Sequence, residues 1–148
     1  MSNNNKFQEF KNAERVWAIG SLHSNIDSFK SIKNYILSNF LKGDKLIFLG
    51  NIIGFRNKYK EIVSDVLSLR FSLMAKFNLN NDDIVFLRGA QEEMFRKLLQ
   101  LQIAPNPGEI LEWIFSHGVD KTLISYNFEP DQFRNVATQG TIQINKFT

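Results

Sequence analysis

The chain has 148 residues and a formal net charge of +3, and 43% of its residues are hydrophobic. This length suits one domain with one hydrophobic core, and the longest apolar runs are far shorter than the ~20 residues that span a bilayer. The sequence contains no cysteine, which excludes a disulfide framework and a thiolate metal site. We therefore expect a single globular domain without a membrane span.

The distribution of charge and the N-terminal sequence also bear on the setting of the protein. Basic residues are interspersed with acidic ones, so we expect no nucleic-acid interface, which requires a basic patch or stripe. The first residues, MSNNNKFQEFKNAER, lack the apolar centre of a secretory signal, which favours a cytoplasmic location. We expect a flexible segment over residues 1–14 and one domain over residues 15–148.

Three short apolar runs are typical of strands that are buried on both faces of a parallel sheet. They are VWAI at 16–19, KLIFL at 45–49 and DIVFL at 83–87. Two amphipathic helical patterns separate them, at 25–41 and at 59–77, and Ser24 with Asp27 forms a start signal for the first. The β-α-β-α-β order predicts an α/β fold with a mostly parallel, layered sheet.

The remainder of the chain is less regular. A helix is expected over 92–102 and a short helix over 107–115, which Gly118 ends. Residues 141–147, TIQINKF, alternate weakly and are compatible with a strand.

Ligand sites of parallel sheets lie beyond the carboxyl ends of the strands. The loops that leave those ends are GSLHS at 20–24, GNIIGFR at 50–56 and GAQEE at 89–93, and each begins with glycine. We expect any functional site to lie in these three loops.

In these loops the chain resembles the calcineurin-like metallophosphoesterases, in particular their branch of bacterial serine/threonine phosphatases and diadenosine-tetraphosphate hydrolases. That branch has GDIHG, GDYxDRG and LRGNHE where this chain has GSLHS, GNIIGFR and LRGAQE. The flanking KLIFLG and the segment EILEWIFSHGVDKTLISY also resemble it, so the likeness extends over residues 16–126. The resemblance implies the N-terminal half of an αββα sandwich.

The resemblance also implies a site for two divalent metals, but most ligand positions have changed. The first aspartate of the family falls at Ser21, the bridging aspartate at Asn51, the asparagine at Ala90 and the catalytic histidine at Gln91, whereas His23 and Glu92 keep the family identity. The DRG part of the second motif is lost as well, since its positions hold Gly54, Phe55 and Arg56.

Two adjacent dications repel each other strongly, and a bridging carboxylate normally makes the pair tolerable. One imidazole satisfies neither hard nor softer metals, so we expect no catalytic residue and no cofactor, with His23 as a weak candidate for a single metal. The alternative interpretation of His23 is a polar residue that is hydrogen-bonded within a loop. His117 is expected to be structural or exposed, and Glu92 and Glu93 to interact with a helix dipole.

Backbone N–H groups of the glycine loops could still bind phosphate without a metal. The candidates for this role are Gly20, Gly50, Gly89 and Arg88. The family's further histidine motifs, GHA and GHT, do not occur before Thr148. Without that second half the sheet would expose an apolar face and an edge, which either the C-terminal residues or a partner would cover.

Three functions are compatible with these features. The leading hypothesis is a catalytically degenerate phosphoesterase-like domain that serves as an interaction or self-assembly module, with a protein partner or a second copy of itself. The first alternative is an active phosphoesterase for phosphoproteins or dinucleoside polyphosphates, with a remodelled Mn, Fe or Zn site. The second alternative is a phosphate or nucleotide sensor without turnover.

Overall fold

The structure is a computed structural model that describes residues 9–138. The expected strand within 141–147 and most of the expected flexible segment lie outside these residues. The three predicted strands form one parallel sheet in the order β1-β2-β3. They are β1 (Arg15–Ile19), β2 (Asp44–Phe48) and β3 (Ile84–Phe86).

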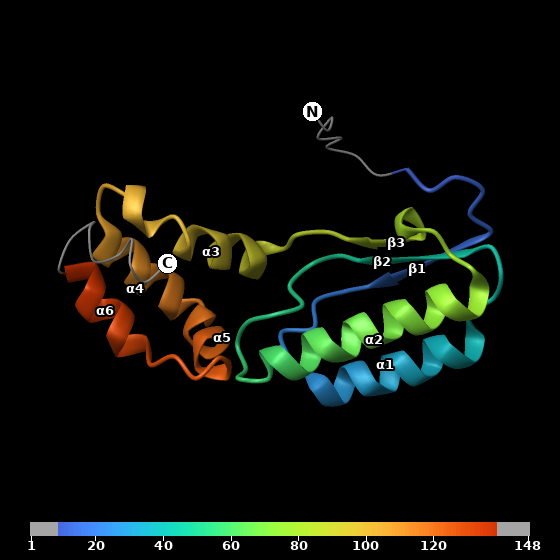
Figure 1. The fold of residues 1–148 in the computed structure, drawn as a ribbon, viewed down its shortest axis with the longest axis horizontal. Coiled ribbons are helices and arrows are strands. Elements are labelled where there is room, and N and C mark those ends of the chain that lie inside the picture. Colours follow the sequence, from blue (N-terminus) through green and yellow to red (C-terminus); the bar gives the residue numbers. More distant parts are fainter. Residues whose placement is uncertain (1–8, 139–148) are drawn as a thin grey trace.

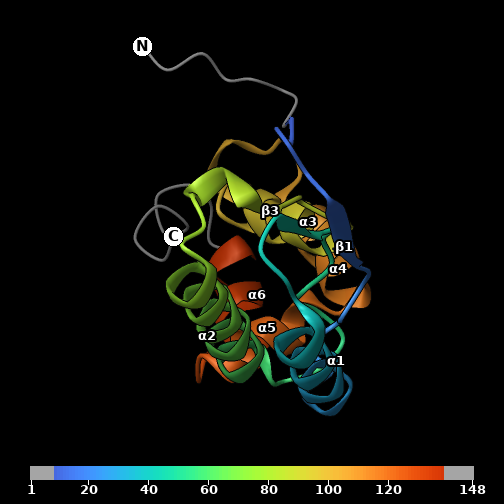
Figure 2. The same ribbon diagram turned by 90° about the vertical axis from the view of Figure 1, so that its right-hand side faces the viewer.

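Two helices connect the strands and cover the sheet on one side. They are α1 (Ile26–Asn39) and α2 (Tyr59–Phe77), and a short 3-10 helix, η1 (Asn81–Asp83), precedes β3. Both views show α1 and α2 side by side under the sheet (Figures 1 and 2). The predicted α/β class and the β-α-β-α-β order are therefore confirmed.

A group of helices follows beyond the carboxyl ends of the strands (Figure 1). It contains α3 (Ala90–Leu98), η2 (Leu101–Ile103), α4 (Pro107–Ser116), α5 (Val119–Ser125) and α6 (Pro130–Thr138). The helix expected over 92–102 thus begins two residues earlier, and its last part is a separate 3-10 turn. Neither α5 nor α6 was predicted from the sequence.

The buried residues form two hydrophobic cores. We call the first the sheet core, because it lies between the strands and α1 with α2; its most buried members are Phe29, Leu46, Phe48, Ile62, Leu69 and Leu73. The second is the helical core of α3 to α6; its most buried members are Leu98, Leu101, Leu111, Ile114 and Val119.

The side of the sheet away from α1 and α2 carries a second set of residues, which are apolar except for one lysine. Strand register places five residues on this side, which we call the open sheet face: Val16, Ala18, Lys45, Ile47 and Val85. Among the described elements, no α-helix packs over it in either view (Figures 1 and 2), although Asp83 of η1 pairs with Lys45 at its edge, and Val16 is 51% exposed. The prediction of strands buried on both faces is therefore wrong for the described part of the chain, because both connecting helices lie on the same face.

A buried carboxylate joins β1, β2 and the end of α1. Asp44 is 1% exposed and accepts hydrogen bonds from the Arg15 guanidinium at 2.8 and 2.6 Å, from Trp17 Nε1 at 2.9 Å and from the Leu41 N–H at 2.8 Å. The Arg15 guanidinium, together with these N–H donors, lowers the pKa of Asp44 from 3.8 to about 2 although burial opposes the shift.

The start of α1 differs from the predicted signal. The Asn25 side chain caps the helix by accepting a hydrogen bond from the Ser28 N–H at 3.3 Å. Ser24 is instead fully buried with φ at +55°, and its hydroxyl has no hydrogen-bond partner among the described residues. The Ser24 side chain is therefore not used to begin the helix.

Candidate functional site

The second and third glycine loops approach each other at two glycines. Gly50 has a φ of +93°, and a Cβ added to it would lie 2.3 Å from the Gly89 nitrogen. A Cβ on Gly89 would lie 2.4 Å from the Asn51 nitrogen. Both glycines are therefore required by a close backbone contact, which brings the loop after β2 against the start of α3.

The carboxylate of Glu92 fills the space that this contact creates. Its Oε2 accepts hydrogen bonds from the N–H groups of Asn51 and Gly89, both at 2.8 Å. Its Oε1 accepts from the N–H groups of Ile52 at 2.8 Å and Ile53 at 3.3 Å. Four backbone donors thus converge on one negative group, which the chain itself supplies.

The side chain of Asn51 links the same loops to the loop after β1. Its Oδ1 accepts a hydrogen bond from the Gln91 N–H at 3.0 Å, and its Nδ2 donates to Ser21 Oγ at 3.2 Å. Gln91, which is 3% exposed, donates from its Nε2 to the His117 carbonyl at 2.9 Å. Three predicted site residues therefore belong to one hydrogen-bonded network that joins the loops.

His23 lies beside this network. Its backbone N–H donates to the Asn51 carbonyl at 2.9 Å, and its ring meets the Phe55 ring edge-on at 4.9 Å. Its φ is +47°, and its Nδ1 is buried without a partner among residues 9–138. The backbone of His23 is thus hydrogen-bonded within the loop, as the structural interpretation expects, whereas the imidazole packs on an aromatic ring.

The donor set of this site does not fit a pair of divalent metals. Within the described residues, no group of three His, Asp or Glu side chains is placed to hold an ion. Ser21, Asn51 and Gln91 offer only neutral groups, and Ala90 offers none. The one carboxylate, Glu92, already accepts from four backbone N–H groups, so the charge that two dications require is missing.

At the second and third loops, the predicted phosphate-binding groups already have partners within the chain. The N–H of Gly89 donates to Glu92, as do the backbone donors that follow Gly50. Arg88 pairs with Glu93 at 2.9 Å, and the hydrogen bonds of Glu93 with Arg96 and Arg88 lower its pKa. Glu92 therefore takes the position that an anion would need in these two loops.

His117 has a structural environment, as expected. Its Nδ1 lies 2.7 Å from the Trp113 carbonyl and 3.1 Å from Ser116 Oγ, and its ring lies 4.7 Å from the Trp113 ring. These contacts hold it at the end of α4. Its carbonyl, rather than its imidazole, reaches the site through Gln91.

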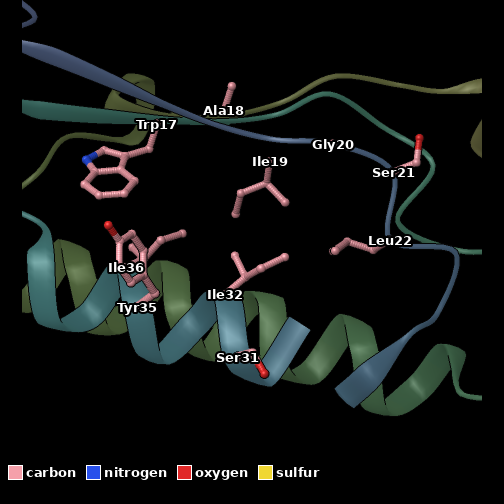
Figure 3. Close-up of a pocket in the computed structure, with 10 residues that line it drawn as sticks. All are labelled: Trp17, Ala18, Ile19, Gly20, Ser21, Leu22, Ser31, Ile32, Tyr35 and Ile36. Carbon is pink, nitrogen blue, oxygen red and sulfur yellow. The ribbon is translucent and has the colours of Figure 1, made fainter. Parts of the chain in front are cut away.

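A separate hollow of about 390 Å³ lies between β1 and α1 (Figure 3). Trp17 and Ile19 point from β1 toward Ile32 and Ile36 of α1, whereas Ala18 points to the opposite side of the sheet (Figure 3). The polar side chains that line it are Ser21, Ser31 and Tyr35, besides the Trp17 indole, and no charged side chain lines it. The hollow therefore offers a mostly apolar surface with a few hydroxyl groups.

Comparison with protein-family models, with curated proteins and with solved structures finds no match to this chain. Among the described helices, none is both long and apolar enough to cross a membrane.

Some residues of the network could not be found from the sequence. The N–H donors of Ile52 and Ile53 and the carbonyl of His117 are backbone groups, so side-chain chemistry gives no sign of them. Phe55 packs on His23. From the sequence, Phe55 was noted only as a replacement in the DRG part of the second family motif. The glycines of the loops were the one signal that pointed to these close approaches.

Proposed function

We propose that this chain is a catalytically degenerate phosphoesterase-like domain that works as an interaction module and pairs with a second copy of itself through the open sheet face. The observation that carries this proposal is an apolar parallel sheet covered by helices on one side only. Parallel sheets are normally covered on both faces. An exposed apolar surface of this kind is typical of a protein contact.

Residues next to the open sheet face extend its apolar character. Leu49 follows β2 and is 49% exposed, and Leu87 follows β3 and is 44% exposed. Within residues 9–138, β1 pairs only with β2, so its other edge also has backbone groups available for pairing. A contact here would cover apolar side chains and satisfy backbone groups together.

The degenerate character is supported by the use of Glu92 and Asn51 as structural groups. An active phosphoesterase would need a base or metal ligand that is free to act on substrate. Glu92 accepts four backbone hydrogen bonds, and Asn51 is bonded at both its oxygen and its nitrogen. His23 then remains as an isolated imidazole beside Phe55.

The self-association is tested by sedimentation velocity of the wild-type chain and two variants. Val16→Glu places a charge on the open sheet face, whereas Phe71→Glu places one on α2, at a residue that is 58% exposed. We expect the wild-type chain and Phe71→Glu to form dimers and Val16→Glu to be monomeric with an unchanged circular dichroism spectrum. A wild-type monomer at the highest attainable concentration, or a dimer that persists in Val16→Glu, would show that the proposed pairing is wrong.

The loss of catalysis is tested separately by metal analysis and hydrolysis of p-nitrophenyl phosphate. Protein purified without added metal is expected to contain no stoichiometric Mn, Fe or Zn and to hydrolyse the ester at the blank rate. A bound metal pair together with turnover that His23→Ala abolishes would support the enzyme instead.

A further inference from the structure

A pocket of about 540 Å³ is lined by Phe55, whose ring contacts His23, and His23 itself does not line it. Its lining comes from the loop after β1, the first turn of α1, the loop before α2, and α5. Figure 1 shows the start of α2 beside α5, and these two helices are in contact. A pocket of this volume is large enough for a small organic ligand.

Positive charge predominates in the lining of this pocket. Arg56, Lys58 and Lys121 line it, with Asp27 as the one carboxylate. Lys58 pairs with Glu61 at 3.3 Å and Lys121 with Asp120 at 3.0 Å, but these pairs are exposed and therefore weak. The Arg56 guanidinium has no hydrogen bond or ion pair with any residue in 9–138.

Two helix starts add to this positive potential. Lys58 is the N-cap residue of the 19-residue helix α2, and its side chain makes no capping hydrogen bond with the first N–H groups of this helix. Ile26 and Asp27, in the first turn of α1, line the same pocket. The positive ends of both helix dipoles therefore favour an anion here.

The independent sign of a ligand is the hydroxyl of Ser24. Ser24 lines the pocket, is 0% exposed, and its Oγ has no hydrogen-bond partner in the described part of the chain. A buried hydroxyl without a partner is costly, and Asn25 has taken over the capping role that would otherwise use it. An acceptor oxygen of a ligand would satisfy this hydroxyl.

The rest of the lining is apolar except for Asn57. Phe55 is 54% exposed at the pocket, and Ile26 and Ile124 lie in the same wall. We propose that this pocket binds a small organic phosphate, with the phosphoryl group between Arg56, Lys121 and Ser24 and the organic part against Phe55. This site uses the last residues of the first two glycine loops, Ser24, Phe55 and Arg56. It does not use the backbone N–H groups of Asn51, Ile52, Ile53 and Gly89, which Glu92 occupies.

Adenosine 5′-monophosphate is a suitable probe, with adenosine, inorganic phosphate and sodium chloride of matched ionic strength as comparisons. A ligand that binds only the folded chain raises its melting temperature, so we expect a rise with the monophosphate, a smaller one with phosphate and none with adenosine or salt. An equal rise with adenosine or salt would overturn the proposal. The absence of any rise with the monophosphate at saturation would do so too.

Three variants locate the binding. Arg56→Gln and Lys121→Gln should each weaken the affinity, measured by calorimetry, by about tenfold, because each removes a charge-assisted hydrogen bond. Arg88→Gln is the matched control beside the third glycine loop and should leave the affinity unchanged. Loss of binding in Arg88→Gln with retention in Arg56→Gln would place the phosphate at the third glycine loop and overturn the proposal.

Ser24→Ala separates a binding role from a structural one. Because the hydroxyl has no partner among residues 9–138, its removal should leave the melting temperature of the unliganded chain unchanged or slightly raised. The affinity for the monophosphate should nevertheless fall several-fold. A destabilised free protein with unchanged affinity would show that the hydroxyl serves the fold alone.

Discussion

At the scale of single residues, Glu92 has the most consequential contacts in the described chain. Its two oxygens accept N–H groups from Asn51, Ile52, Ile53 and Gly89, so one side chain joins the loop after β2 to the start of α3. Hydrogen bonds to an ionised acceptor are about twice as strong as neutral ones. The connection between the sheet and the helical group therefore depends strongly on this carboxylate.

Glu92→Gln tests this role. The amide keeps one acceptor oxygen but turns an NH2 group toward backbone donors, which leaves part of the set unsatisfied. We expect the free energy of unfolding to fall by about 2 kcal/mol, measured by urea denaturation. Glu93→Gln is the control, since Glu93 forms only exposed ion pairs with Arg88 and Arg96 and should cost less than about 0.5 kcal/mol. Equal effects of the two variants would contradict the role of Glu92.

At the scale of elements, the loops that follow β1 and β2 differ in what they require of their first residue. Gly50 has a positive φ and meets the backbone of Gly89, whereas a Cβ on Gly20 would have no atom within 4 Å. Gly20 and Gly50 therefore occupy the same position in their loop sequences, but only Gly50 lies in a conformation and a contact that require glycine.

The pair Gly20→Ala and Gly50→Ala makes this difference measurable. We expect Gly50→Ala to cost about 3 kcal/mol or more, because a strained φ combines with a backbone clash. Gly20→Ala should change the stability by less than about 1 kcal/mol and can raise it, because alanine has less freedom in the unfolded chain. Thermal unfolding of both variants decides the matter, and a tolerated Gly50→Ala would disprove the close contact.

The elements that could be predicted are those whose signal is local. Strand β1 and helix α2 follow from apolar runs and helical spacing, and α2 was predicted at its observed bounds. Helix α5 was missed because a glycine after a helical pattern indicates the end of a helix. In the structure Gly118, with a φ of +90°, is also the N-cap residue of α5, so a new helix begins directly after it. The role of Glu92 was predicted only as an interaction with a helix dipole, since the approach of the β2 loop depends on tertiary packing.

At the scale of the whole molecule, the described carboxylates whose pKa values shift all shift in one direction. The pKa of Asp44 is lowered by its hydrogen bonds with Arg15, and that of Glu112 by its hydrogen bond with Arg134. Burial raises the pKa of Asp83, but the hydrogen bond and charge of Lys45 together with the hydrogen bond from the Asn80 N–H outweigh this effect and lower it. Groups with a lowered pKa stabilise the folded state above their unfolded pKa and lose this effect as the pH falls.

We therefore expect the free energy of unfolding to fall steeply in acid. For Asp44, the difference between 3.8 and about 2 corresponds to roughly 2 kcal/mol. This stabilisation is complete above about pH 5 and is lost as the pH falls through about 2. Urea denaturation at several pH values measures it.

Asp44→Asn identifies the group responsible. The variant should lose about 3 kcal/mol at neutral pH, because it removes the charge that pairs with Arg15 and leaves one acceptor oxygen for the buried donors. Its stability should then fall less between about pH 5 and pH 2. Asp82→Asn, at an exposed residue in η1, should keep the wild-type profile. A profile for Asp44→Asn that parallels the wild type would assign the acid sensitivity to other carboxylates.

The separation of the two cores along the chain has a consequence for synthesis on the ribosome. All members of the sheet core fall between residues 17 and 84, and all members of the helical core between residues 94 and 133. Chains emerge N-terminus first and fold in units as these become complete. The strands and their two helices can therefore assemble while the later helices are still being translated, and Glu92 would then fasten the second unit to a first one that is already formed.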